Sequence, residues 1–339
     1  MIHKRKNGVL AVLIVILIIF SGCNAPSSNQ PKDDATIIYQ GCSVHYLDVG
    51  QGDCVFIRLP DGKNMLIDSG DKSDKICEYV IEYLENYSVK TIDYFILTHP
   101  DLDHIGNALD VINNFEVEKV FIPYISDEIM VNFPEYIKVK DAISQKEIKT
   151  EISNSYTYIN GSDYNFAFLS PLPFGNNGSS YDELNTTLIS TDSLINNLSP
   201  IIYFETENTR FIFTGDAGKS QENIVINNYK VGVYKSWFSR YGITVNLEDI
   251  DYLKVGHHGA DDSSGREFLN LLRPKNAIIS VGGNNYYGHP KTEVLERLMI
   301  ANENHSLFRT DVHGTIVVHK NANGNFVTST QSQQNKSVA

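Results

Sequence analysis

Cysteine is scarce in this sequence, and its arrangement excludes one class of metal site. The chain of 339 residues contains four cysteines, Cys23, Cys42, Cys54 and Cys77, and no Cys-x-x-Cys unit. A zinc site built from cysteine thiolates is therefore not available. Cys42 and Cys54 flank an expected hairpin and could form a disulfide, although we favour small buried thiols at both positions.

Basic residues are also few relative to acidic ones. The sequence has 28 Lys and Arg against 41 Asp and Glu, and its formal net charge is −13. An acidic body repels polyanions at long range. A substrate that carries phosphate would therefore need a bound metal ion, or a local group of Lys and Arg side chains, in order to approach.

The N-terminal segment is basic and then apolar. Lys4, Arg5 and Lys6 precede an unbroken apolar run over residues 9–20, which is shorter than the roughly 20 residues that span a bilayer. This pattern is typical of a signal peptide, which we predict over residues 1–22.

Cys23 stands directly after the predicted signal peptide. The pair Ser21-Gly22 before it resembles a bacterial lipoprotein cleavage box, although Phe20 departs from the usual Leu or Val. We therefore predict that Cys23 is lipidated and that residues 23–36 form a flexible tether. An uncleaved anchor is the alternative. Both interpretations predict an extracytoplasmic protein attached to the bacterial cell membrane.

The remaining residues alternate short strands with helices, and 42% of the whole chain is hydrophobic. We expect a single domain over 37–320 and a disordered polar tail over 321–339. Residues 123–165 show no clear period and are predicted to be an irregular insertion. The periodicities predict strands and helices as follows: strands at 44–49, 54–59, 64–67, 92–97, 120–122, 201–204, 210–214, 252–255, 277–281 and 315–318, and helices at 74–86, 104–113, 267–272 and 291–301.

The segment His99-Pro100-Asp101-Leu102-Asp103-His104 concentrates metal-competent side chains directly after an apolar run, residues 92–97. If that run is a buried parallel strand, His99 and Asp101 leave its carboxyl end, and Asp103 and His104 open the next helix. Four donors then converge on one concavity, as a cation or a pair of cations requires. Helix capping would explain one or two of the four, but not all.

Six segments occur in an order that is informative as a set. They are Tyr46–Asp53, Leu66–Gly70, Thr98–Gly106, Phe213–Asp216, Lys254–Gly259 and Tyr287–Pro290. Together they resemble the metallo-β-lactamase-fold hydrolase domain of ComEC-type competence proteins, over roughly residues 43 to 320 and in a stand-alone secreted form. The resemblance implies an α/β fold, the αββα four-layer sandwich, with a metal centre at one edge between two β-sheets.

The resemblance also implies a ligand set. His99 and Asp101 would bind one divalent ion and Asp103 and His104 a second, with Asp216 bridging both. His257 would complete the second site, and the pair of ions would hold a hydroxide for attack. Asp68 would orient the loop from beneath, or cap a turn.

Two departures from the family pattern affect the metals. Asp101 replaces a histidine found in the wider superfamily, and its harder oxygen donor favours Mn²⁺ or Mg²⁺ relative to Zn²⁺. No histidine occurs between His104 and His257, so the first site lacks a ligand. Asn185 could help there, or simply form a turn. We expect one or two divalent ions, Mn or Zn with Mg also compatible.

The candidate catalytic residues are Asp103, His258 and His289. Because neighbours on a strand point to opposite sides, only one of His257 and His258 can face the metals. We assign His257 to metal and His258 to proton transfer or phosphate contact, and the reverse stays open. His289 could donate a proton to the leaving oxygen, bind metal, or be an ordinary turn residue.

Phosphate contacts are harder to assign. The family usually has a Lys where this chain has Asp261, which weakens the case for a nucleic-acid substrate. Arg309 could contact phosphate or pair with Asp311. Trp237 lies in an aromatic and basic stretch, 229–248, which could stack bases or cover the core.

The leading hypothesis is a metal-dependent hydrolase of phosphodiesters, a nuclease with single-stranded DNA as the candidate substrate. Hydrolysis of an ester, lactone or β-lactam by the same centre is a second hypothesis. A non-catalytic surface binding module is a third.

Overall fold

The computed structural model describes residues 41–172 and 191–332. The predicted signal peptide, the lipidation site Cys23, the tether and Asn185 lie outside the described residues. None of the described helices combines the length and apolar character needed to cross a membrane.

The first sheet contains eight strands in the order β17-β16-β1-β2-β3-β5-β7-β8. Strands β3, β5, β7 and β8 run parallel to one another, and the remaining pairs, including β2 with β3, are antiparallel. Its strands are β1 Ser43–Tyr46, β2 Val55–Arg58, β3 Asn64–Ile67, β5 Tyr94–Ile96, β7 Lys119–Ile122, β8 Lys149–Ile152, β16 Ile316–Lys320 and β17 Phe326–Thr330.

The C-terminal strands confirm one prediction and correct another. The predicted strand 315–318 is present as β16, which pairs with β1 in the first sheet. The tail was expected to be disordered from Asn321, yet β17 pairs with β16 along its whole length. A hydrogen-bonded turn at Asn321 reverses the chain, and Phe326 contacts the Phe211 ring at 6.1 Å. Sheet pairing and one aromatic anchor therefore override the polar composition.

The second sheet contains seven strands in the order β15-β14-β13-β12-β11-β10-β9. The predicted hairpin is present, with β11 and β12 antiparallel and joined at Glu207-Asn208, while β12 to β15 run parallel. Its strands are β9 Tyr158–Asn160, β10 Tyr164–Phe168, β11 Ile202–Thr206, β12 Thr209–Phe213, β13 Tyr252–Lys254, β14 Asn276–Ile279 and β15 Ser306–Arg309.

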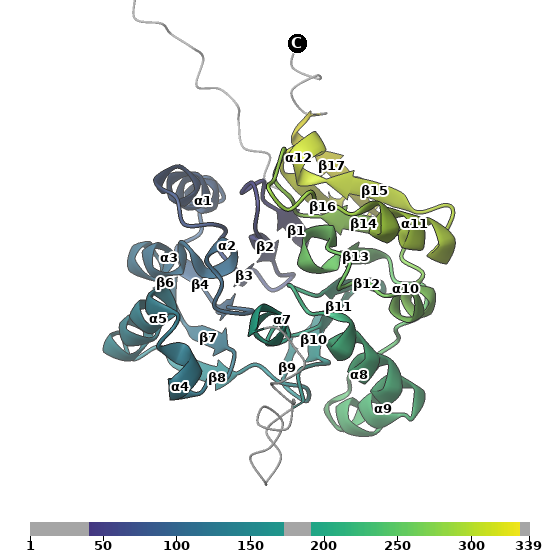
Figure 1. The fold of residues 1–339 in the computed structure, drawn as a ribbon, viewed down its shortest axis with the longest axis horizontal. Coiled ribbons are helices and arrows are strands. Elements are labelled where there is room, and N and C mark those ends of the chain that lie inside the picture. Colours follow the sequence, from purple (N-terminus) through teal and green to yellow (C-terminus); the bar gives the residue numbers. More distant parts are fainter. Residues whose placement is uncertain (1–40, 173–190, 333–339) are drawn as a thin grey trace, which may run out of the picture. The chain divides into compact units, whose positions relative to one another are not determined.

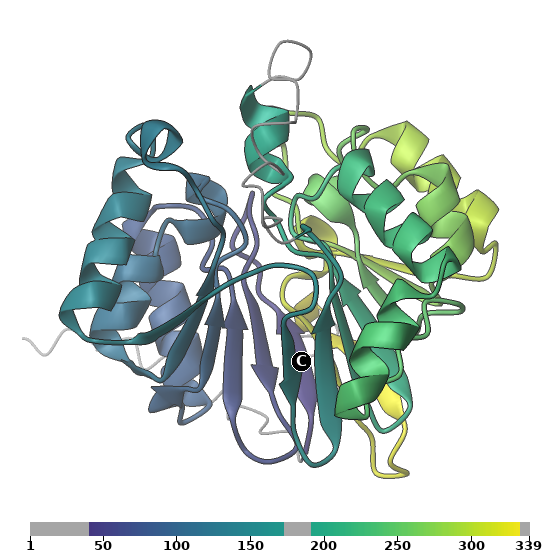
Figure 2. The same ribbon diagram turned by 90° about the horizontal axis from the view of Figure 1, so that it is seen from below.

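Helices cover the outer face of each sheet, with the two sheets between them (Figures 1 and 2). Residues 123–165 were predicted to be irregular, but they hold α4, α5, β8 and β9. The first helical layer contains α1 Asp74–Asn86, α3 Ala108–Asn114, α4 Asp127–Met130 and α5 Pro134–Gln145, and the second contains α8 Lys219–Lys230, α9 Val233–Phe238, α10 Arg266–Leu272 and α11 Thr292–Ala301. Short elements complete the set: β4 Thr91–Ile92 pairs with β6 Glu116–Val117, and α2 Leu102–Ile105, α7 Thr191–Asn196 and α12 Thr310–His313 lie in connections.

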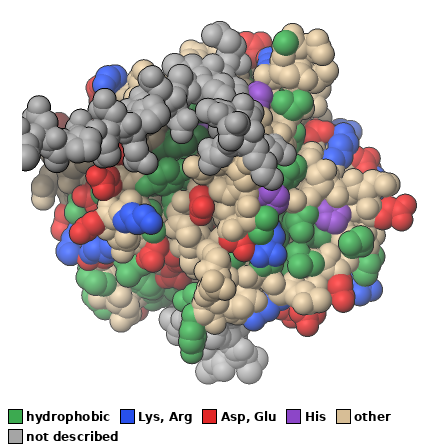
Figure 3. All heavy atoms as spheres, turned by 90° about the horizontal axis from the view of Figure 1, so that it is seen from above, with side chains coloured by type: hydrophobic (Ala, Val, Ile, Leu, Met, Phe, Trp, Pro, Cys, Tyr) green, Lys and Arg blue, Asp and Glu red, His purple; other side chains and the backbone are tan. Residues whose placement is uncertain are grey.

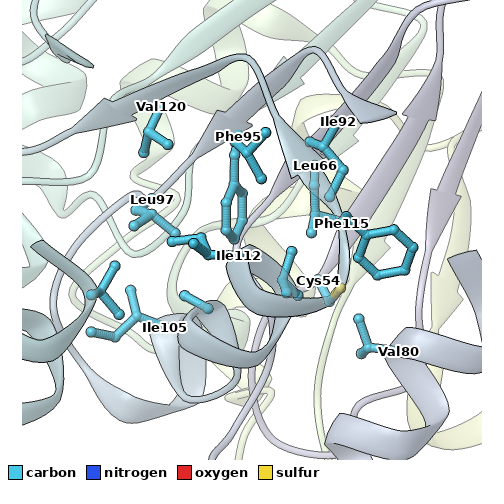
Figure 4. Packing of buried hydrophobic residues seen from close by; sticks show 14 of the residues in the cluster. Cys54, Leu66, Val80, Ile92, Phe95, Leu97, Ile105, Ile112, Phe115 and Val120 are labelled. Carbon is cyan, nitrogen blue, oxygen red and sulfur yellow. The ribbon is translucent and has the colours of Figure 1, made fainter. Parts of the chain in front are cut away.

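Three apolar layers hold these elements together. The first lies between the first sheet and its helices, where Phe95, Leu97 and Ile112 interlock (Figure 4). A second lies between the other sheet and α8 to α11, and a third between the two sheets, where Phe166 and Phe204 stack at 4.2 Å. Each fully buried side chain of this size contributes roughly 1.5–3 kcal/mol. The layers confirm the αββα sandwich.

The cysteines behave as small apolar side chains. Cys42 and Cys54 are buried free thiols, and Cys77 is partly buried and free. Burial raises the pKa of Cys42 to about 12. The disulfide between Cys42 and Cys54 is therefore absent, in agreement with the favoured interpretation.

Candidate metal centre

The loop that carries the His-x-Asp-x-Asp-His pattern leaves the carboxyl end of β5. This strand lies between β3 and β7 and is parallel to both, as the apolar run predicted. Asp103 and His104 lie on the short helix α2. A second turn supports this helix from the side: Asp53 donates its backbone N–H to the Asp103 carbonyl at 3.1 Å. Gly52 has φ +137°, and a Cβ there would lie 2.2 Å from the same carbonyl, so only glycine fits.

Four side chains converge at the edge of the two sheets, and we call them the main cluster: Asp103, His104, Asp216 and His258. Asp216 follows β12, and His258 lies in the turn Gly256–Gly259 that follows β13. The Nε2 atom of His104 is 3.3 Å from Asp216 Oδ1. The Nε2 atom of His258 is 3.3 Å from Asp103 Oδ2 and 3.4 Å from Asp216 Oδ2.

Polar atoms of the main cluster point at one another without forming hydrogen bonds. Within the described residues, His104 Nε2, His258 Nε2 and Asp216 Oδ1 are buried and have no hydrogen-bond partner. Buried polar atoms are rarely left unpaired. Two imidazoles and two carboxylates with free donor atoms facing one point are the ligand chemistry of Mn²⁺, Fe²⁺ or Zn²⁺. The main cluster therefore fits a divalent cation.

Electrostatics leads to the same conclusion. Burial by itself would lower the pKa of His258, but the Asp216 and Asp103 carboxylates raise it to about 10. The pKa of His104 is likewise raised well above its usual value, chiefly by Asp216 and Asp68 opposing the effect of burial. The carboxylates thus stabilise positive charge at the main cluster. Protons on the histidines provide this charge when no cation is bound, and a divalent ion would provide more of it.

Asp68 lies beneath the loop and holds His104. Its Oδ2 accepts a hydrogen bond from His104 Nδ1 at 2.8 Å and from the Thr98 hydroxyl at 2.7 Å. Its Oδ1 accepts the Thr98 backbone N–H at 2.8 Å. With Nδ1 donating to Asp68, the Nε2 lone pair of His104 faces the main cluster. Asp68 therefore lies beneath the loop and contacts His104, which is the position expected of it from the sequence.

His258, and not His257, belongs to the main cluster, which is the reverse of the assignment expected from the sequence. His258 Nδ1 donates to the Ser280 carbonyl at 2.8 Å, which turns Nε2 into the main cluster. The expectation assumed a continuing strand, but β13 ends at Lys254. Both histidines have left-handed backbone angles, φ +47° and +53°, so the alternation of a strand does not apply.

His257 occupies the rim instead. Its Nδ1 is 2.8 Å from Asp262 Oδ1, and its Nε2 is 3.3 Å from Asn196 Nδ2 and 3.7 Å from Asp216 Oδ2. Its side chain is 23% exposed, against 2% for His258. His257 is therefore the better placed of the two to meet a substrate.

His99 and Asp101 form a separate pair beside the main cluster, which we call the His99 pair. His99 Nε2 is 3.5 Å from Asp101 Oδ2, and the His99 ring centroid is 4.1 Å from that of His104. Ser199 Oγ, 3.2 Å from His99 Nδ1, also accepts the Asp216 backbone N–H. Within residues 41–172 and 191–332 no third histidine or acidic residue joins this pair.

Two buried charges were missed by the sequence analysis. Lys254 is 1% exposed, and its Nζ lies 2.5 Å from Asp53 Oδ2 and 3.2 Å from the Gly215 carbonyl. Asp53 Oδ1 lies 3.6 Å from His258 Nδ1. The ion pair joins the turn before β2, the end of β13 and the turn before Asp216. Both residues stand in segments that carried the family resemblance, which was the available signal.

His289 lies outside the main cluster. Its ring centroid is 5.8 Å from that of His257 and 5.7 Å from that of Tyr287, and it stacks on Tyr287 at 9°. Burial and the neighbouring cationic imidazoles lower its pKa to about 4, so the ring is neutral at pH 7. His289 thus borders the centre next to His257.

The other candidates have structural partners. Arg309 pairs with Asp311 through two contacts, at 3.0 and 2.5 Å. Asp261 accepts from Arg297 at 2.6 Å. Trp237 packs on Tyr156 at 4.8 Å and donates to its carbonyl. Trp237 therefore covers the second apolar layer.

Basic side chains do not gather on the face shown in Figure 3. Where grey atoms do not cover it, Lys and Arg are dispersed among Asp and Glu, and histidine side chains reach the surface. The absence of a basic patch on the uncovered part of this face agrees with the excess of Asp and Glu over Lys and Arg in the sequence. Attraction of an anionic substrate would thus depend on local groups near the centre.

The fold and the centre together define a metallo-hydrolase of the αββα class. The family description "Metallo-beta-lactamase superfamily" matches residues 47–283, and the chain belongs to that superfamily. The relative ComE operon protein 3 of Bacillus subtilis is 32% identical over 301 residues, covering 84% of this chain and 34% of that protein. Recombination protein 2 of Haemophilus influenzae is 26% identical over 262 residues, covering 75% of this chain and 26% of its own length.

The chain is thus similar to the hydrolase domain of ComEC-type competence proteins, and it spans about a third or less of the curated relatives it matches. Among solved structures, CmlA, a diiron beta-hydroxylase from Streptomyces venezuelae, aligns with a TM-score of 0.50 at 14% identity. The alignment covers 83% of this chain and 54% of that one. This likeness shows the fold alone.

Proposed function

We propose that this protein is a metal-dependent phosphodiesterase that cleaves nucleic acid, and that it works at the outer face of the cell membrane. The main cluster is the observation that carries the proposal. The ligand atoms of two carboxylates and two imidazoles lie within 4.8 Å of one another, and this mixed oxygen and nitrogen set suits ions that act on phosphate oxygens.

Divalent ions bound there would lower the pKa of water and neutralise charge on a phosphoryl oxygen. The residues of the chain have distinct tasks in this proposal. Asp103, His104, Asp216 and His258 hold the cation. Asp68 fixes the His104 ring through the 2.8 Å hydrogen bond, and the Ser280 carbonyl fixes His258.

Proton transfer is assigned to the histidines at the rim of the metal centre. His257 is partly exposed and keeps its Nδ1 against Asp262, and His289 lies beside it. These are the two imidazoles at the rim of the centre. We assign His257 the donation of a proton to the leaving oxygen of the substrate, because the Asp216 and Asp262 carboxylates outweigh burial and raise its pKa, and His289 is its neutral neighbour.

One further consideration supports a nucleic-acid substrate. Two of the relatives are named for recombination and for competence, processes that handle DNA. The net charge of −13 opposes binding of a polyanion, but bound cations would offset that repulsion locally. The outer location rests on the N-terminal sequence pattern.

The direct test is hydrolysis of single-stranded DNA and of bis(p-nitrophenyl) phosphate by the protein after EDTA treatment and reloading with Mn²⁺. We expect cleavage that EDTA abolishes and Mn²⁺ restores. Asp216→Ala should be inactive and should retain less metal, because Asp216 faces both imidazoles of the main cluster. Asp74→Ala, an exposed carboxylate on α1, is the matched control.

The competing functions give different results. Turnover of nitrocefin or of a simple ester, without turnover of either phosphodiester, would assign the centre to acyl substrates. Metal-independent ligand binding that survives Asp216→Ala would indicate a binding module. Either outcome contradicts the proposal.

A further inference from the structure

A row of aromatic rings leads from the main cluster to the surface, and we call it the aromatic row. Its members, in order, are His258, His257, His289, Tyr287 and Tyr286. Successive ring centroids are 6.2, 5.8, 5.7 and 6.0 Å apart. The row therefore connects the candidate reaction centre with the outside without a gap.

Exposure rises along the aromatic row. The His258 side chain is 2% exposed and that of His257 is 23% exposed. Tyr287 is 60% exposed and Tyr286 is 99% exposed. Two adjacent tyrosines this open to solvent stand out, because large aromatic side chains normally bury much of their surface. A ligand that covered them would gain that burial on binding.

The loop that carries the tyrosines is fixed by its own hydrogen bonds. Asn285 Nδ2 donates to the carbonyls of Gly282 and His289, at 2.9 and 2.8 Å, and Asn285 Oδ1 accepts the His289 N–H at 2.9 Å. Lys291 Nζ donates to the Tyr287 carbonyl at 2.6 Å. The tyrosines are thus presented on a preorganised turn, which limits the entropy lost when a ligand binds.

Lys291 adds the complementary charge. Its ammonium group donates to the Tyr287 carbonyl and therefore lies beside the tyrosine pair. A stacking surface beside a cation is the usual combination for single-stranded nucleic acid, because every base has a π-face and every linkage a negative charge.

We propose that Tyr286 and Tyr287 stack the bases that flank the scissile phosphodiester, with Lys291 next to the adjoining phosphate. The proposal deepens the proposed function, on which it rests, by assigning a base-binding subsite to a named loop. It predicts that the protein distinguishes a strand with bases from a strand without them. Trp237, which packs on Tyr156 and donates to its carbonyl, is not part of this base-binding subsite.

The test compares two single strands of equal length, one of thymidylates and one abasic, both with phosphorothioate linkages to resist cleavage. Binding to the full-length Mn²⁺-loaded protein is measured by fluorescence anisotropy. Tyr286→Ala/Tyr287→Ala should weaken binding of the thymidylate strand roughly 5- to 150-fold for each base that loses its partner. Binding of the abasic strand should be unchanged.

Two variants serve as controls. Tyr286→Phe/Tyr287→Phe should keep most of the affinity, since stacking needs the ring and not the hydroxyl. Tyr158→Ala removes a 37% exposed tyrosine of β9, in the second sheet, that stacks on Tyr241, and it should leave both affinities unchanged. Equal weakening on both strands, no weakening on either, or no binding by the wild type would each overturn the proposal.

Failure of this inference is distinguishable from failure of the proposed function. Cleavage of ordinary phosphodiester strands at rates independent of the two tyrosines would leave the phosphodiesterase standing and remove the base-binding subsite. Tyrosine-dependent binding without cleavage of any strand would leave the base-binding subsite standing and contradict the phosphodiesterase.

Discussion

The His99 pair and two members of the main cluster, Asp103 and His104, come from the same loop, but the protein supports the two groups differently. In the main cluster, His104 is held by a buried carboxylate and His258 by a backbone carbonyl. His99 is held by two hydroxyls, those of Thr98 and Ser199, and its neighbour Asp101 is 36% exposed. Charged acceptors orient an imidazole more firmly than hydroxyls do.

The comparison indicates two unequal metal sites. The main cluster has four converging donors before any ion arrives, whereas the His99 pair has two within the described residues. A preassembled, charge-rich site binds tightly because little reorganisation is needed. We therefore expect a tight site at the main cluster and a weaker one at the His99 pair.

The largest effect should come from exchanging His258 for alanine. Mn²⁺ titration of the metal-free protein by calorimetry should show His258→Ala losing the tight phase. The loss should exceed the roughly 10- to 100-fold typical of removing an outer-shell partner. His257→Ala, its neighbour in the chain, should keep that phase, because His257 faces Asp262 at the rim. Retention of the tight phase in His258→Ala and its loss in His257→Ala would restore the assignment expected from sequence.

A second large effect should come from Lys254. Lys254→Met leaves the Asp53 carboxylate buried without its ammonium partner, and breaking a buried ion pair in this way destabilises by about 3–5 kcal/mol. Urea denaturation of the metal-free protein measures the change. Lys254→Met/Asp53→Asn removes both charges and should recover much of the loss. A loss below about 1 kcal/mol in the single variant would show that Lys254 is not essential to the folded state.

Asp68 and Asp101 allow the two sites to be weakened one at a time. Asp68→Asn should weaken the tight Mn²⁺ phase by roughly 10- to 100-fold, because the amide no longer fixes His104 as a carboxylate does. Asp101→Ala should act mainly on the weaker phase, because Asp101 is the carboxylate of the His99 pair. Equal effects of both substitutions on both phases would show that the two sites are one coupled unit.

Sequence reasoning reached the fold and most of the loop because both depend on local patterns. The apolar run before His99 predicted a buried parallel strand, and α1 is Asp74–Asn86, the range that the helical period indicated. Reasoning failed at 123–165 and at the tail. There the structure depends on strand pairing that composition does not report: β8 pairs with β7, and β17 forms a hairpin with β16 in spite of a polar sequence.

The errors at the metal centre arise from backbone angles and long-range contacts, which local sequence patterns do not report. Assigning His257 and His258 required the backbone angles after β13, and the left-handed pair at these residues breaks the strand rule. The Lys254 and Asp53 pair joins residues about 200 positions apart, and no local period reports such contacts. A lysine inside a strand suggests a solvent-facing position, whereas this one is buried.

The pH dependence of stability separates protons from metal in the main cluster. The pKa of His258 is raised from 6.5 to about 10 in the folded protein, since its neighbouring carboxylates outweigh burial. A raised pKa stabilises the fold where the histidine is protonated in both states, that is, below about pH 6.5, and this contribution is lost as the pH rises through about 10. The unfolding free energy of the metal-free protein should therefore fall over this range, and His258→Gln should reduce the slope. Mn²⁺ should flatten it as well, because the cation replaces the proton. Identical slopes with and without Mn²⁺ would show that no ion occupies the place of that proton.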